Sequence, residues 1–409
     1  MVTMRHNLRI EEKLQWGRLA SPRSDTEKVP FNWYIFKNGF GSELVYNVLT
    51  NFGLSVGDVV FDPFCGGGTT LVQAKLSGYN SMGLDISPFS VFLSNVLTRS
   101  YNPERLTDYL KKIPHKINAR VYVPDVSILR KSFTDLSLKY IYSLRDSIIS
   151  LDSSYRDFFL FSLLSILNSV SKAKKSGGFL RITGEKKASV DTIKITFLKT
   201  TQKFINDMKY LNYPKRYARA VLGDARDYPA EVKQQEYDAI LTSPPYPNRH
   251  DYTRIYELEL LVGFIRDNPS LKSLRYDTLR SHVEAKKKYE AFGYAPPALL
   301  EKKISELHNR ELNNRQIIST LYGYFEDMYL CLKQMFTVIK KGKYVGLVVS
   351  NVRFAGVMIP VDILLSQLAE QVGLRTQRIY VLRYKGNSSQ QMREHNREPA
   401  RESLVIWKK

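Results

Sequence analysis

Residues 59–70 read Val-Val-Phe-Asp-Pro-Phe-Cys-Gly-Gly-Gly-Thr-Thr, and this stretch decides the fold. Its first three residues are apolar without alternation, which is typical of a strand buried on both faces of a parallel sheet. A glycine-rich turn and a helical pattern follow, which together form the first half of a βαβ unit. Glycines let backbone N–H groups approach a ligand, and the helix N-terminus adds partial positive charge. We therefore predict an α/β fold with a ligand at the turn; the alternative is a turn that only joins strand to helix.

Two patterns narrow the choice of ligand. The turn has neither the G-x-G-x-x-G of dinucleotide sites nor the Gly-Lys-Ser/Thr of a phosphate-binding P-loop. Downstream, the strand-like run 81–85 ends in Asp85, and a carboxylate at such a strand end suits a ribose diol. A glycine turn without phosphate chemistry, together with a ribose-binding acid, favours S-adenosylmethionine.

The stretch resembles the cofactor motif of the amino-group DNA methyltransferases, commonly written Asp-Pro-Phe-x-Gly-x-Gly-Thr-Thr. About seven strand-like runs alternate with helical patterns, as in a class I methyltransferase: a Rossmann-like, mostly parallel, seven-stranded sheet. In related enzymes an acid at the end of a further strand, or the backbone beside it, holds the adenine, and Asp224 occupies this place. The expected cofactor-binding residues are Asp62, Phe64, Cys65, Gly66, Gly68, Thr69, Thr70, Asp85, Ile86, Asp224 and Ala225.

A second motif, Ser243-Pro244-Pro245-Tyr246, follows a strand-like run at 237–242. The amino nitrogen of a nucleobase is a poor nucleophile, because its lone pair is delocalised into the ring. A site that methylates it must accept its N–H groups while the nitrogen pyramidalises. Prolines fix φ and remove backbone donors, so this loop is stiff and presents carbonyl groups and the Ser243 hydroxyl. Tyr246 offers a ring on which an extruded base can stack. We predict that these four residues are catalytic.

The expected reaction needs no strong base, because the amino proton can leave after methyl transfer. Serine at the first position of this motif is often seen in the cytosine-N4 enzymes of the resembled family. The sequence therefore predicts a site-specific DNA methyltransferase that acts on cytosine N4 of a flipped base, with adenine N6 as the alternative. An RNA guanine-N2 methyltransferase and a non-catalytic nucleic-acid-binding module are further alternatives. No RNA-binding domain is recognised before the core, and the intact motifs argue against loss of catalysis.

Composition points to the same partner. The formal net charge is +21, and 12% of the residues are aromatic, which suggests a nucleic acid partner; the alternative is a basic enzyme without one. The resemblance implies that this partner is double-stranded DNA. The two cysteines allow neither a disulfide framework nor a cysteine zinc site, so we expect no metal and a cytoplasmic location. The most apolar run, 158–170, is too short to span a bilayer, so no membrane role is expected. A cognate restriction endonuclease is a candidate partner.

The pattern divides the chain into an N-terminal arm (1–30) with little intrinsic order, a core (31–100 and 216–409) and two insertions. The largely helical insertion 101–215 and the polar insertion 248–317 are both candidates for DNA contact. By its position, the segment 31–51 at the start of the core matches a segment that closes over the cofactor in the resembled family; the alternative is a helix that packs on the edge of the sheet.

Three basic stretches supply the expected DNA contacts: a cationic, glycine-bearing loop at 172–181, the residues after the catalytic motif at 248–254, and the stretch 383–391. Lysine mainly contacts phosphate, whereas Gln and Asn can read base edges. The alternative is that these loops are simply solvated. The expected DNA-binding residues are Lys172, Lys174, Lys175, Arg181, Arg249, Tyr252, Arg254, Gln390 and Gln391.

Overall fold

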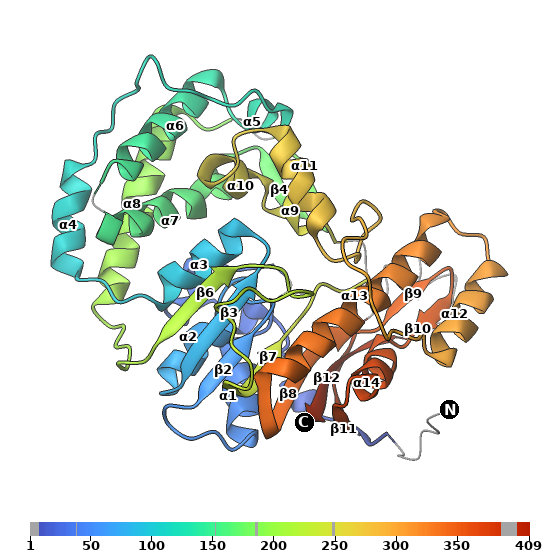
Figure 1. Cartoon of the computed structure of the whole chain (residues 1–409). Helices are drawn as coiled ribbons and strands as arrows, with labels where there is room; N and C mark the ends of the chain where they lie inside the picture. The colour runs from blue at the N-terminus through green and yellow to red at the C-terminus, as the bar shows by residue number, and fades with distance from the viewer. Residues whose placement is uncertain (1–7, 38, 152, 185–186, 248–249, 386–398) are drawn as a thin grey trace.

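The computed structural model describes residues 8–37, 39–151, 153–184, 187–247, 250–385 and 399–409. A twisted central sheet carries helices on both faces, and a largely helical lobe lies beyond one end of its strands (Figure 1). The sheet has eight strands in the order β1-β11-β12-β8-β7-β2-β3-β6. β2, β3, β6, β7 and β8 run parallel, whereas β12 is antiparallel to both β8 and β11. The predicted fold class, a mostly parallel class I methyltransferase sheet, is confirmed.

Apart from β1, each strand of this sheet contains one of the strand-like runs predicted from the sequence. Their bounds are β1 Ile10–Glu12, β2 Val59–Asp62, β3 Asn80–Asp85, β6 Ala218–Leu222, β7 Tyr237–Thr242, β8 Ile339–Ser350, β11 Arg375–Lys385 and β12 Ala400–Lys408. Successive residues of β2 point to opposite faces: Val60 packs with α1 (Ser42–Asn51), and Phe61 packs with α13 (Gln316–Val338). α14 (Val361–Gln371) shares the face of α13, while α2 (Thr69–Leu76) and α3 (Pro88–Thr98) follow β2 and β3.

The helical lobe combines parts of both predicted insertions. The first insertion supplies α4 to α8 and the hairpin β4–β5, and the second supplies α9 to α11. One hydrophobic cluster joins them, and the Tyr142 hydroxyl donates to the Leu261 carbonyl at 3.1 Å. The bounds are α4 Pro103–Lys112, α5 Ser127–Ser132, α6 Asp135–Ile149, α7 Ser153–Val170, β4 Ala173–Ser176, β5 Phe179–Ile182, α8 Val190–Met208, α9 Tyr252–Ile255, α10 Glu257–Gly263 and α11 Asn268–Asp277. α12 (Ala298–His308) and the hairpin of β9 (Val352–Phe354) and β10 (Val357–Ile359) lie beside α13 and α14 (Figure 1).

Two predictions about local order are wrong. Residues 8–30, the described part of the N-terminal arm, are ordered, because Ile10–Glu12 adds β1 as an eighth, parallel edge strand beside β11. Further along the arm, the buried Asp25 carboxylate accepts hydrogen bonds from the backbone N and the hydroxyl of Ser42, at 2.5 and 2.9 Å, at the start of α1. The predicted loop at 172–181 is instead the antiparallel hairpin β4–β5. Within the described ranges, none of the helices combines the length and apolarity that crossing a bilayer requires.

Candidate active site

A cavity of about 1150 Å³, part of it open to solvent, lies where β2, β3, β6 and β7 end. The carboxyl ends of the strands are where open α/β sheets place their ligands. Its wall contains residues of both sequence motifs, including Ser243 and Pro245 of the second, and Phe36, Gly39 and Phe40 from the start of the core. Gly68, Pro244 and Tyr246 are not part of the wall. The predicted cofactor-binding residues in the wall are Asp62, Phe64, Cys65, Gly66, Thr69, Thr70, Asp85, Ile86, Asp224 and Ala225.

The glycine turn is shaped by close packing. Gly66 and Gly68 have φ values of +47° and +78°, which side chains disfavour. A Cβ atom at Gly67 would lie 2.6 Å from the Cβ of Phe36, so only glycine lets this ring cover the turn. The Phe36 ring also stacks on Tyr256, with centroids 4.5 Å apart. The sequence analysis explained these glycines by the close approach of a ligand to the backbone. The structure adds a second reason, which is the packing of the Phe36 ring over the turn.

Two carboxylates hold the turn in place. Asp62 is 3% exposed and accepts hydrogen bonds from the Phe64 backbone N at 3.1 Å and the Thr242 hydroxyl at 2.5 Å. Asp85 accepts from the backbone N–H groups of Gly66 and Ser87, at 2.9 and 2.8 Å. Burial raises the pKa of each carboxyl to about 6, although these hydrogen bonds act in the opposite direction. A carboxylate has about four acceptor sites, so Asp85 can still accept from a ligand.

The charge of the cavity is opposite to that of the chain. Three acids (Asp62, Asp85 and Asp224) line it, and its described wall contains neither lysine nor arginine, although the chain carries a net charge of +21. Such a wall disfavours phosphate groups and favours a ligand that carries positive charge. S-adenosylmethionine, with its sulfonium and ammonium groups and its ribose diol, therefore fits the residues present.

The second motif leaves β7 and is fixed by a chain of hydrogen bonds that ends on β12. The Ser243 hydroxyl donates to the Tyr246 hydroxyl at 3.3 Å, which in turn donates to Glu402 at 3.2 Å. Glu402 is 2% exposed and also pairs with Arg383 and with Lys385, the latter at 2.5 Å. Because Ser243 gives away its only proton, its oxygen lone pairs remain free to accept. The sequence analysis missed Glu402, since nothing local links it to Tyr246.

The opposite wall comes from the second insertion, at positions that the sequence analysis did not single out. They are Leu274, Thr278, Leu279, Ser281 and His282. The Thr278 hydroxyl and the His282 Nε2 lie 3.0 Å apart, and burial lowers the pKa of His282. Apart from Leu274, which lies in α11, these residues follow that helix, so no periodic pattern marked them.

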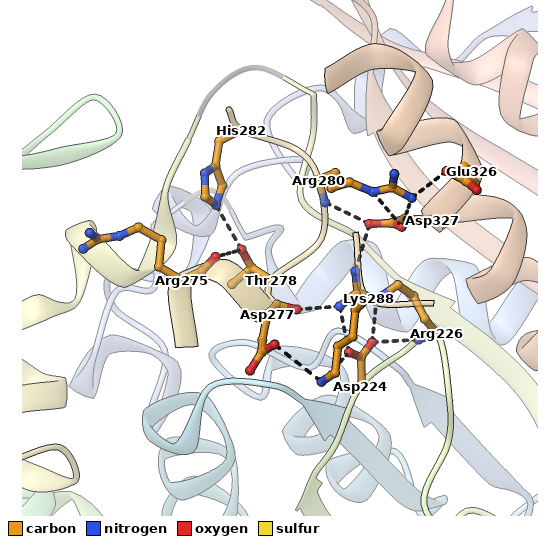
Figure 2. A network of polar contacts seen from close by, with 10 residues as sticks. All are labelled: Asp224, Arg226, Arg275, Asp277, Thr278, Arg280, His282, Lys288, Glu326 and Asp327. Atoms are coloured by element: carbon orange, nitrogen blue, oxygen red, sulfur yellow. Dashed lines mark hydrogen bonds and ion pairs between the residues drawn. The ribbon is translucent and has the colours of Figure 1, made fainter. Parts of the chain in front are cut away.

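A buried ionic network holds this wall against the core (Figure 2). Asp327 of α13, fully buried, accepts from Arg226 at 2.9 Å and from the side chain of Arg280 at 2.5 and 3.0 Å. Arg226 also grips both oxygens of Asp224, at 2.9 and 2.8 Å, and donates to the Asp277 carbonyl at 2.5 Å. The network therefore joins the end of β6, the insertion and α13. It also occupies much of the Asp224 carboxylate, which leaves the neighbouring backbone as the group able to meet an adenine.

The candidate DNA-binding residues are scattered in the structure. Lys175 is mostly buried and pairs with the buried Glu259 at 2.8 Å, so it is not placed for the predicted phosphate contact. Lys172 is half-buried, the half-buried Lys174 donates to the Asn168 carbonyl at 3.3 Å, and Arg181 is exposed. Tyr252 lines the cavity, whereas Arg254 pairs with Asp251 and Glu284. The remaining candidates, Arg249, Gln390 and Gln391, lie outside the described residues.

The parallel sheet, the glycine turn and the acidic cavity define an S-adenosylmethionine-dependent methyltransferase. Comparison with known proteins identifies the family within this class. Residues 13–95 match the family described as DNA methylase. The Type II methyltransferase M.BsoBI of Geobacillus stearothermophilus is 32% identical over 98% of this chain and 90% of its own length. M.AvaI of Nostoc sp. is 29% identical over 99% of this chain and 91% of its own. The chain belongs to the amino-group DNA methyltransferase family, among the Type II methyltransferases.

Proposed function

We propose that the chain transfers a methyl group from S-adenosylmethionine to cytosine N4 of a base flipped out of double-stranded DNA. One observation carries this proposal: the glycine turn and Asp85 share a single cavity with Ser243 and Pro245. A methyl donor held at the turn and an amino group held at the loop would thus meet in one cavity. A cognate restriction endonuclease is the partner we propose, because the similar proteins are Type II methyltransferases.

The residues that would hold the cofactor follow from the wall of the cavity. Asp85 would accept the ribose hydroxyls, Ile86 would pack beside the adenine, and the backbone at Asp224 and Ala225 would meet the adenine amino group. The turn Asp62–Thr70 would surround the methionine part, with Phe36 as its cover. Bound there, S-adenosylmethionine supplies an electrophilic methyl group on a positively charged sulfur.

The catalytic loop would hold the acceptor nitrogen. The free lone pairs of Ser243 and the carbonyl groups of the proline loop would accept the amino N–H groups, which favours the pyramidal nitrogen. The chain from Ser243 through Tyr246 to Glu402 keeps the hydroxyl proton of Ser243 directed away from the cavity. The Tyr246 ring would stack on the extruded base and offset part of the cost of flipping it.

The methylated nucleoside identifies which base, and which atom of it, accepts the methyl group. Plasmid DNA incubated with the protein and a labelled methyl donor should yield N4-methylcytosine after digestion to nucleosides and mass analysis. N6-methyladenine as the only product would contradict the inference from Ser243 and leave the reaction class intact. A 5-methylcytosine product would rule out the mechanism, because that chemistry needs a cysteine nucleophile and the buried Cys65 and Cys331 have pKa values raised by burial.

Replacing Asp85 by asparagine should weaken cofactor binding about tenfold, which corresponds to the loss of one charge-assisted hydrogen bond. Calorimetric titration with S-adenosylmethionine measures the change, and the melting curve reports on the fold. Asp58→Asn is the control, because Asp58 precedes β2 at the opposite end of the strand, where its carboxylate accepts from the Ser55 backbone N and lies 3.9 Å from the Lys343 ammonium. Equal affinities of the Asp85 and Asp58 variants would remove Asp85 from the cofactor site.

A further inference from the structure

The hairpin β4–β5 has two chemically different faces. Cross-strand partners share a face, and the register pairs Lys174 with Arg181 and Ser176 with Phe179. These four residues form the outer face, on which Phe179 is 52% exposed and Arg181 is also exposed. Lys175 and Leu180 alternate with them and form the inner face, where Leu180 is buried. We call this two-stranded element the ribbon.

The inner face fastens the ribbon to the body of the protein. The Lys175 ammonium lies 2.8 Å from the fully buried Glu259 and 2.5 Å from the Tyr34 hydroxyl. It also lies over the Tyr256 ring, 4.2 Å from the centroid. The buried ion pair between Lys175 and Glu259 fixes the orientation of the ribbon, because any tilt of the ribbon would leave a buried charge unpaired. The ribbon is therefore a positioned element.

The ribbon stands beside the active-site cavity. Tyr256, which contacts Lys175, stacks on Phe36, and both rings line the cavity. At the turn of the ribbon, Lys37 donates to the Gly177 carbonyl at 2.6 Å. β5 also packs against α9, the helix that follows the catalytic loop, and Figure 1 shows β4 beside α9 and α10. A molecule that lies on the outer face of the ribbon thus reaches the region where the catalytic loop ends.

The outer face combines an exposed cation with an exposed aromatic ring. Arg181 places its guanidinium group at the surface, whereas the half-buried Lys174 opposite it donates to the Asn168 carbonyl at 3.3 Å. Phe179, next to the turn, exposes half of an aromatic ring. A partner that offers closely spaced negative charges and stacked aromatic rings would satisfy both features, and duplex DNA is such a partner.

We propose that the outer face of the ribbon lies in a groove of the target duplex, with Arg181 on a phosphate and Phe179 against the base stack at the extruded nucleotide. The major groove of DNA admits a two-stranded ribbon, and apolar side chains are known to support unstacked base steps. The inference rests on the proposed base flipping. It assigns to Phe179 the role of filling the gap that the extruded base leaves in the base stack, while Tyr246 stacks on the extruded base.

The test compares Phe179→Ala, Arg181→Ala and a matched control, Tyr46→Ala, whose side chain on α1 is likewise 52% exposed. Substrates are two duplexes that carry the target site, mapped beforehand on DNA methylated by the wild-type protein. One duplex is fully paired, and the other has a mismatch opposite the target base. Single-turnover methyl transfer should fall about 10- to 100-fold for Phe179→Ala on the paired duplex and recover on the mismatched one, where unstacking costs less.

Arg181→Ala should weaken binding to both duplexes and reduce the salt slope of log K by roughly 0.9, as expected for one lost phosphate contact. Tyr46→Ala should match the wild type. Equal losses for Phe179→Ala on the two duplexes, or rates equal to those of Tyr46→Ala, would overturn the role of Phe179. A wild-type protein that methylates no DNA in the mapping step would refute the proposed function itself, whereas wild-type activity with an unaffected Phe179→Ala variant refutes only the ribbon.

Discussion

Replacing Asp327 by asparagine should lower the free energy of unfolding by about 3–5 kcal/mol. Asp327 is fully buried and accepts from both Arg226 and Arg280. Removing its negative charge leaves the two guanidinium groups without a full counter-charge in an environment that solvates them poorly. Urea unfolding followed by circular dichroism measures the change as a shift of the midpoint at constant slope.

The neighbouring Glu326→Gln variant is the matched control, because Glu326 is on the same helix and pairs with Arg280 at 2.9 Å but is 19% exposed. Its loss should cost less than about 1 kcal/mol, as for pairs near the surface. The Asp327 variant should also bind S-adenosylmethionine more weakly, since the network holds the wall that contains Thr278 and Leu279. Equal midpoints for the two variants would show that the network does not stabilise the fold.

The parts of the fold that could be predicted are those whose signals are local. The run Tyr237–Thr242 is apolar except for Asp238 and Thr242, and it forms β7, which is buried throughout. The turn at Asp62–Thr70 carries its glycines and helix start in one stretch, so its conformation and its place at a strand end followed from the sequence. Asp85 could be expected at the cavity for the same reason, since it ends the next strand.

The parts that could not be predicted depend on partners far apart in the chain. Residues 1–30 look unstructured because Ile10–Glu12 is only three residues long and gains its order from β11, more than three hundred residues later. Lys175 looks like its neighbours Lys172 and Lys174, and only the position of Glu259 on α10 makes it an internal anchor. Glu402 sits at the polar start of β12, where nothing local predicts a bond to Tyr246. Each of these assignments is set by tertiary contact, which overrides local preference.

Tyr246→Ala should reduce the rate of methyl transfer about 5- to 150-fold, because stacking of a base on an aromatic ring contributes roughly 1–3 kcal/mol. Its affinity for S-adenosylmethionine should stay within about twofold of the wild type, since Tyr246 lies outside the cavity wall where the cofactor would bind. Single-turnover rates with saturating DNA, together with calorimetry for the cofactor, separate these two effects.

Tyr246→Phe divides the role of the ring from that of the hydroxyl. The phenylalanine ring keeps the stacking face, but it can neither accept from Ser243 nor donate to Glu402. Without its acceptor, the Ser243 proton is free to turn toward the cavity, where it would compete with the amino N–H groups for the Ser243 oxygen. We therefore expect a smaller loss for phenylalanine than for alanine, confined to the chemical step and not restored by a mismatched target. If the phenylalanine variant were as slow as the alanine variant, the hydrogen-bond chain to Glu402 would be the dominant contribution of Tyr246, and the stacking role would be wrong.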